Sequence, residues 1–115
     1  MRDKGFYEYV IHDLLGGMPG ITSRPMFSGW GIYKDGIIFA IIADGELYFK
    51  ADEENQKYFE RLSSTPFSYT MKNGKVSTLS YRILPEEARE DKRELEQWIA
   101  RSVGASIRAK KRRKK

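Results

Sequence analysis

The chain has no cysteine, and only one histidine occurs among its 115 residues. The lack of cysteine excludes disulfide bonds, thiolate nucleophiles and thiolate-bound zinc or iron–sulfur sites. His12 has no other histidine or cysteine to help it hold a metal ion, and it lies between Ile11 and Asp13 in a segment predicted to be helical. We therefore interpret His12 as a surface or boundary residue and expect neither a metal nor a cofactor.

Long apolar runs are missing as well. The longest one, Ile37–Ala43, is much shorter than the roughly 18 to 20 residues that a membrane-spanning helix requires. The N-terminal segment Met1–Lys4 leads into no apolar stretch of the kind found in signal peptides. Together with the absence of cysteine, these features predict a cytoplasmic protein that has no membrane partner.

Groups typical of catalysis are also scarce. Acidic residues cluster within 52–54 and 86–91, but both clusters fall where helices are predicted to begin, and the helix macrodipole stabilises them there. Neither cluster lies in an apolar context that would suit it to acid–base catalysis. The segment Phe27–Gly31 carries two glycines, but it lacks the lysine–serine ending of a phosphate loop and precedes another strand. We therefore predict that the chain is not an enzyme.

Positive charge is plentiful, and its distribution is uneven. The net charge is +5, yet seven basic residues lie in the last eight positions, so residues 1–107 carry 14 basic and 16 acidic residues. The seven are Arg108, Lys110, Lys111, Arg112, Arg113, Lys114 and Lys115. Such a cluster attracts nucleic acid through counterion release, although phosphate contacts alone carry no base specificity. The alternative is a solubility tail, or cations that favour the end of a helix. We place a folded domain at 1–107 and a disordered basic tail at 108–115.

Apolar periodicity predicts three helices. In residues 3–15, two adjacent rows of apolar residues spaced four apart form one stripe, and the following Gly16–Gly17 pair ends the helix. A short helix is predicted at Glu53–Leu62 with Asp52 as its cap, and a final helix at Lys92–Ile107.

Turn signals and alternating patterns predict an antiparallel sheet. The dipeptides Asp35–Gly36, Asp44–Gly45 and Asn73–Gly74 suit the positive φ angles of tight hairpins. About five strands follow, with a bulge or close strand packing at Gly29 and Gly31. The predicted strands are Ser23–Lys34, Ile37–Ala43, Glu46–Ala51, Phe67–Lys72 and Val76–Leu84. The predicted fold class is α+β, an antiparallel sheet built from hairpins and packed with N-terminal, middle and C-terminal helices.

Two features of the predicted strands suggest contacts with other molecules. Ile37–Ala43 has no polar position, so both of its faces should be covered, either by helices of this chain or by a second subunit in a homodimer. Tyr33 and Tyr48, with Lys34 and Lys50, are residue types that bind single-stranded nucleic acid, although such residues are also ordinary partners across a sheet.

Between the first and the last predicted helix, several segments occur in a distinctive order. They are Pro19–Thr22, Arg24–Tyr33, Phe39–Lys50, Pro66–Tyr69 and Ser80–Glu87. In this order and spacing the chain resembles the TfoX N-terminal domain family, known from the TfoX and Sxy competence regulators, from about Phe6 to Val103. The resemblance implies an α+β fold and a link to natural competence, in which full-length members are similar to coactivators that work with the cyclic-AMP receptor protein. Those members carry a second, C-terminal helical domain, in whose place this chain has the basic tail.

We therefore expect a non-enzymatic regulatory or interaction domain whose partners are proteins, the transcription machinery among them. Its tail would add weak, nonspecific affinity for nucleic acid. The alternative function is a small-molecule- or anion-binding domain, or a minor enzyme, with a pocket between the sheet and the helices and with Arg24 holding an anion. Neither the residues nor the resemblance supplies a catalytic residue or a metal ligand.

Overall fold

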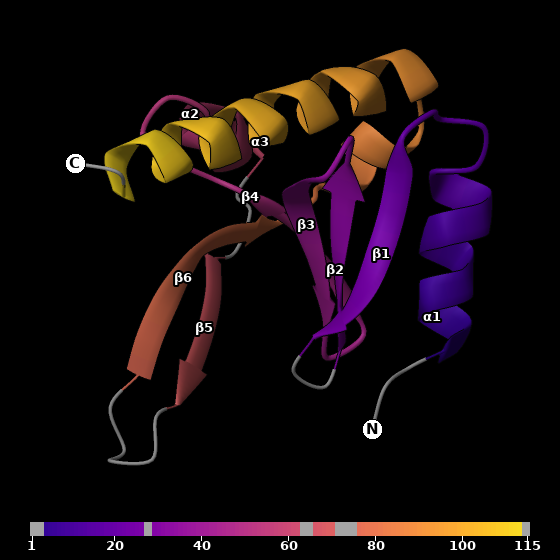
Figure 1. The fold of residues 1–115 in the computed structure, drawn as a ribbon, viewed down its shortest axis with the longest axis horizontal. Helices are drawn as coiled ribbons and strands as arrows, with labels where there is room; N and C mark the ends of the chain where they lie inside the picture. The colour runs from indigo at the N-terminus through magenta and orange to yellow at the C-terminus, as the bar shows by residue number, and fades with distance from the viewer. Residues whose placement is uncertain (1–3, 27–28, 63–65, 71–75, 114–115) are drawn as a thin grey trace.

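The computed structural model describes residues 4–26, 29–62, 66–70 and 76–113, and for residues 66–70, 76–79 and 112–113 it describes the backbone. The predicted turn at Asn73–Gly74 and the residues Lys114 and Lys115 lie outside this part. The elements in chain order are α1 (Lys4–Glu8), the π-helical η1 (Tyr9–Leu14), β1 (Ile21–Met26), β2 (Gly29–Lys34), β3 (Ile37–Ala43), β4 (Glu46–Lys50), α2 (Gln56–Arg61), β5 (Pro66–Thr70), β6 (Val76–Ile83), η2 (Glu86–Arg89) and α3 (Lys92–Arg113). The predicted α+β class is confirmed (Figure 1).

The strands form one antiparallel sheet with the order β1-β2-β3-β4-β6-β5, in which six strands take part. Asp35 and Asp44 have φ angles of 50° and 52°, and the glycines that follow them have φ angles of 82° and 72°. Positive φ at both central positions is the geometry that tight hairpins require, so the two predicted Asp–Gly turns are confirmed. The hairpin of β5 and β6 extends away from the other strands (Figure 1).

The segment predicted as one strand at Ser23–Lys34 is instead two strands, β1 and β2. They pair with each other, so that Met26 lies opposite Gly29. The reversal could not be predicted from the sequence, because no Asn–Gly or Asp–Gly dipeptide marks it and strand-forming residues stand on both sides. The bulge in this region lies between Ile32 and Tyr33. At Gly29 the other predicted alternative, close strand packing, is confirmed, because a Cβ atom there would overlap the carbonyl oxygen of Ile42.

The main hydrophobic core lies between helices and one face of the sheet. Trp30, Ile42 and Leu47 are neighbours in the strand register and belong to the same core cluster as Leu15, which follows η1, and Ile99 in α3. A ring from the first helix, Tyr7, stacks on Trp30 with 4.4 Å between the centroids. The first and the last helix therefore pack on one core, which joins them to the sheet.

The central position predicted for Ile37–Ala43 is confirmed, since β3 lies inside the sheet and the four residues from Phe39 to Ile42 are buried. Ile41 is 3% exposed although it lies outside the main core cluster, and it is in register with Gly31 and Tyr48. The homodimer that could cover this second face stays a prediction.

The last helix is longer than its apolar pattern indicates. α3 continues through Arg113, whereas its prediction ended at Ile107. The boundary placed between residues 107 and 108 therefore falls within a helix, and the basic residues up to Arg113 are helical. Arginine, lysine and alanine are good helix formers, and positive side chains near a helix C-terminus are favoured by the macrodipole.

Candidate functional site

The end of β4 leads into a turn that its own side chains close. The Asp52 carboxylate accepts hydrogen bonds from the backbone N–H groups of Glu54 and Asn55, at 3.0 and 3.1 Å. In return, the side-chain oxygen of Asn55 accepts a bond of 2.7 Å from the N–H of Asp52. These reciprocal bonds define the turn before α2, which begins at Gln56. Asp52 thus caps the turn and not, as predicted, the helix itself.

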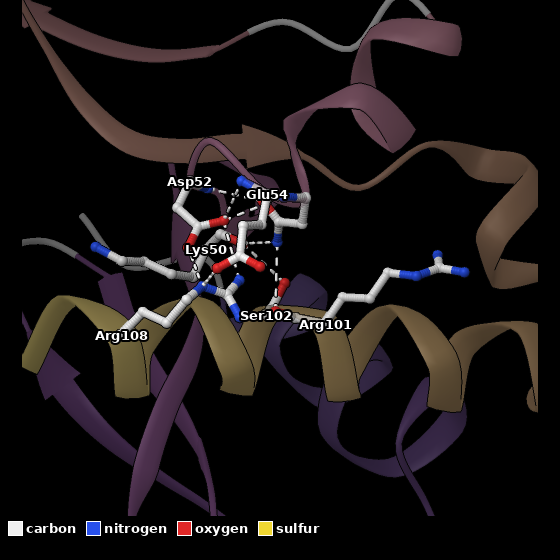
Figure 2. Close-up of polar contacts among 7 residues, drawn as sticks. Lys50, Asp52, Glu54, Arg101, Ser102 and Arg108 are labelled. Carbon is white, nitrogen blue, oxygen red and sulfur yellow. Dashed lines mark hydrogen bonds and ion pairs between the residues drawn. The ribbon is translucent and has the colours of Figure 1, made fainter. Parts of the chain in front are cut away.

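Arg108 reaches this turn from α3 (Figure 2). Its Nε lies 2.6 Å from a carboxylate oxygen of Asp52 and 2.6 Å from one of Glu54, and a terminal nitrogen lies 3.1 Å from the second oxygen of Asp52. The Asp52 side chain is 11% exposed and that of Arg108 is 32% exposed. Bidentate, charge-assisted contacts of this kind hold both side chains in a defined geometry. We call this contact the Asp52–Arg108 pair.

The protonation of the Asp52–Arg108 pair follows from its surroundings. Burial raises the pKa of Asp52, but the hydrogen bond and charge of Arg108, with the N–H groups of Asn55 and Glu54, outweigh burial and hold this pKa below its ordinary value. The hydrogen bond to Asp52 likewise raises the pKa of Arg108. Both groups are therefore charged at neutral pH.

Buried polar groups beside the Asp52–Arg108 pair attach α3 to the sheet. The Ser102 hydroxyl donates to the carbonyl of Lys50 at 2.9 Å, and the Asn55 amide donates to the same carbonyl at 3.0 Å and to that of Arg101 at 3.5 Å. Further along α3, the Ser106 hydroxyl donates to the carbonyl of Ile38. Sequence reasoning missed these contacts. The signal was available in the sequence, since Ser102 and Ser106 follow Trp98 at intervals of four residues and so share its face of the helix.

A concave surface of about 300 Å³ lies where the end of α3 meets the sheet. We call it the sheet-end hollow; its lining residues are Tyr33, Gly36, Ile37, Ile38, Lys50, Tyr81, Ser106, Ala109 and Lys110. The Lys50 ammonium lies 5.0 Å from the centroid of the Tyr81 ring, close enough for a cation–π contact. Among the described residues that line the hollow there is no carboxylate. The site therefore combines aromatic rings, an apolar floor and positive charge.

Of the four strand residues proposed from the sequence to bind nucleic acid, two lie at the sheet-end hollow and two do not. Tyr33 and Lys50 line the sheet-end hollow. Lys34 instead donates a hydrogen bond of 2.6 Å to the carbonyl of Pro19. Tyr48 is absent from the lining, and burial, followed by the charges of Glu46 and Asp44, raises the pKa of its phenol. An acidic neighbourhood makes Tyr48 a poor site for phosphate.

The basic residues of the predicted tail also differ in their surroundings. Arg108 is engaged with Asp52 and Glu54, which indicates a structural role. Lys110 and Lys111 are exposed, and neither makes a hydrogen bond or ion pair with another residue of the described part. The backbones of Arg112 and Arg113 are helical. Within the described chain, Lys110 and Lys111 are thus the tail cations best placed to meet an anionic partner.

A second concavity, which we call the helix-side hollow, lies between α3 and two turns and has a volume of about 480 Å³. Its charged lining residues are Lys34, Asp35, Lys92 and Glu96, and its apolar ones include Met18, Pro19, Ile99 and Val103. Lys92 donates a hydrogen bond of 3.0 Å to the carbonyl of Gly16. Positive and negative side chains balance here, in contrast to the sheet-end hollow.

The remaining candidates lie apart from both hollows. Arg24, proposed for an anion, is exposed on β1 at the edge of the sheet and lines neither hollow. His12 lies 2.9 Å from the Glu8 carboxylate and is 67% exposed, which confirms its interpretation as a surface residue. In the described ranges there is no group of three or more metal-ligating side chains, and no helix is long and apolar enough to cross a membrane.

Comparison with models of protein families shows to which family this chain belongs. The model of the TfoX N-terminal domain matches residues 13–106, a range that contains all six strands. The chain belongs to the TfoX N-terminal domain family. A curated relative of this domain, Protein Sxy of Escherichia coli (strain K12), is 27% identical over 102 residues, which cover 89% of this chain and 48% of Sxy. The chain therefore spans about half the length of this relative, and the resemblance seen in the sequence is confirmed.

Proposed function

We propose that this TfoX N-terminal domain is a non-enzymatic regulatory module that binds a protein partner belonging to the transcription machinery. The observation that supports this proposal is the family match over residues 13–106, which includes the whole sheet and most of α3. The similarity to Sxy adds weight to a role of the competence-regulator type. Since one fold supports many functions, the proposal depends on a partner that can be demonstrated directly.

Weak affinity for nucleic acid is the second component of this proposal. It rests on the exposed Lys110 and Lys111 at the end of α3 and on the basic residues that follow them. Such positive charge would bind phosphate groups without sequence preference and would lose affinity steeply as salt displaces it. This affinity could hold the module near DNA while a protein contact supplies specificity.

Ending the chain after Ala109 tests both components. This change removes the six basic residues of Lys110–Lys115 and retains Arg108, which a stop after Ile107 would also remove. We expect affinity for duplex DNA at low salt to fall by roughly tenfold or more, because counterion release is lost. Fluorescence anisotropy at two salt concentrations measures this change. If the full and the shortened chain bind DNA with equal affinity, the basic end of α3 does not bind nucleic acid.

Affinity capture from the native cell, with and without nuclease, provides the protein arm of the same test. Partners that the full chain retains after nuclease treatment, and that the chain ending at Ala109 also captures, would support a protein-binding module. Partners that all disappear with nuclease would contradict it, because nucleic acid would then account for the capture.

The helix-side hollow favours a second candidate function, the binding of a small molecule. Its apolar wall with converging lysine and carboxylate groups suits a compact ligand that carries both charges. In a thermal-shift screen, such a ligand should raise the melting temperature of the wild type more than that of Lys92→Ala. Arg24→Ala is the matched control and should respond as the wild type does, because Arg24 lines neither hollow. A ligand that stabilises all three proteins equally binds elsewhere.

A further inference from the structure

We propose that the sheet-end hollow binds single-stranded nucleic acid, with a base against Tyr33 and Tyr81 and the adjoining phosphates beside Lys50 and Lys110. This inference rests on the nucleic-acid affinity of the proposed function and deepens it, since it assigns a built site and a strand preference. Sequence analysis singled out Tyr33 and Lys50, and the fold adds Tyr81 from β6 and Lys110 from α3.

The chemistry of the lining fits an unstacked nucleotide. Proteins that bind single strands combine positive charge along the backbone with aromatic rings on which bases stack. Here Tyr33 and Tyr81 supply rings, and Ile37 and Ile38 supply apolar surface. The volume of about 300 Å³ is at the lower end of the range for ligand sites, which suits one nucleotide. Bases within a duplex are stacked on their neighbours, so the hollow should favour single strands.

The charge of the hollow distinguishes it from the other concavity. In the helix-side hollow, Lys34 and Lys92 donate to backbone carbonyls and share the lining with two carboxylates. The sheet-end hollow has two lysines and, among its described lining residues, no acid. Lys110 is exposed and forms no hydrogen bond or ion pair within the described chain. The exposed Lys110 ammonium group beside the aromatic rings, in a lining whose described residues include no carboxylate, therefore favours an anionic, planar ligand.

The hollow is also held in shape before any ligand binds. Lys110 stands two positions after Arg108, which the Asp52–Arg108 pair ties to the turn that follows β4. Ser106 donates to the carbonyl of Ile38, and both residues line the hollow. Binding to a surface whose parts are already positioned requires less ordering of side chains and backbone. The pair therefore positions Lys110 at the rim of the hollow.

Two neighbouring lysines provide a matched test. Lys110→Gln and Lys111→Gln make the same change of charge at exposed positions of α3, but only Lys110 lines the hollow. The probe is a fluorescein-labelled 12-residue oligo(dT), measured by anisotropy with the full chain at low and moderate salt. We expect Lys110→Gln to weaken binding roughly fivefold and Lys111→Gln to have less than about half that effect. Tyr81→Leu, which keeps every charge, should weaken binding by about tenfold through lost stacking.

The following outcomes would contradict the inference. If Lys110→Gln and Lys111→Gln weaken binding equally and Tyr81→Leu has no effect, the helix end binds polyanions in general, and the proposed function stands without this site. If a duplex of the same length binds as tightly as oligo(dT), the strand preference is absent. If polyglutamate displaces the probe as effectively as unlabelled oligo(dT) at equal charge concentration, the hollow has no preference for bases. If the wild type binds neither strand form at low salt, the nucleic-acid component of the proposed function fails as well.

Discussion

Gly29→Ala should lower the free energy of unfolding by about 3 kcal/mol or more, since overpacking that displaces backbone is among the costlier core changes. A Cβ atom at Gly29 would overlap the backbone carbonyl oxygen of Ile42 and lie 2.9 Å from its carbon. Gly29 stands at the start of β2, next to the central strand β3 that supplies Ile42. The backbone cannot yield without disturbing the pairing of the two strands. Urea unfolding, followed by circular dichroism, measures the loss.

Gly31→Ala is the matched control in the same strand. The Cβ atom would meet the Cδ1 atom of Ile38 at 3.2 Å and the sulfur of Met26 at 3.3 Å, both at the ends of flexible side chains. These ends can move, so we expect a loss of about 1 kcal/mol, at the lower limit for overpacking. Equal losses for the two variants would show that space beside the Ile42 carbonyl is not what selects glycine at position 29.

Arg108→Ala should lower the free energy of unfolding by about 2 kcal/mol. It leaves the largely buried Asp52 carboxylate without its counter-charge; the full cost of breaking a buried pair is larger, but solvent reaches part of Arg108 here. Lys111→Ala, on the same helix and without an ion pair in the described chain, should change stability by less than about 0.5 kcal/mol. Urea unfolding of both variants provides the measurement, and similar losses would contradict a stabilising role for the pair.

A double-mutant cycle with Asp52→Asn and Arg108→Gln isolates the interaction between the two charges. An asparagine at position 52 keeps an oxygen for the N–H groups of Glu54 and Asn55 but has no charge. We expect a coupling free energy of about 1 kcal/mol at neutral pH. Additive effects of the two substitutions would mean that the pair contributes nothing beyond its separate contacts.

The pH dependence of this coupling follows from the lowered pKa of Asp52. A carboxyl whose folded pKa is lower than its unfolded pKa adds stability at all pH values above the unfolded value, which is about 3.9. The contribution decreases as pH falls below that value and vanishes once Asp52 is protonated in the folded state as well. The difference in stability between the wild type and Asp52→Asn should therefore be constant from about pH 5 upwards and shrink in more acidic solution.

The Asp52–Arg108 pair shows why the candidate site exceeds what sequence analysis could predict. The sequence identified Asp52 as a cap and Arg108 as a tail cation, and both assignments followed from local rules about helix ends and charge runs. Their contact joins residues 56 positions apart and depends on how α3 crosses the end of β4. The position of a helix over a sheet is decided by core packing, which local patterns do not encode.

The sequence by itself determined the α+β class, the presence of an N-terminal, a middle and a C-terminal helix, the Asp–Gly hairpins, the central place of β3 and the family of the chain. These features depend on side-chain periodicity, on turn dihedral angles and on the order of segments, all of which can be read along the chain. Only the tertiary structure decided that Ser23–Lys34 is two strands, that the basic residues up to Arg113 continue a helix, and that Tyr33, Lys50, Tyr81 and Lys110 line one hollow. The physical reason is that strand register and helix packing bring together residues that are distant in the sequence. The free energy of the whole fold, and not that of any local segment, selects this register and this packing.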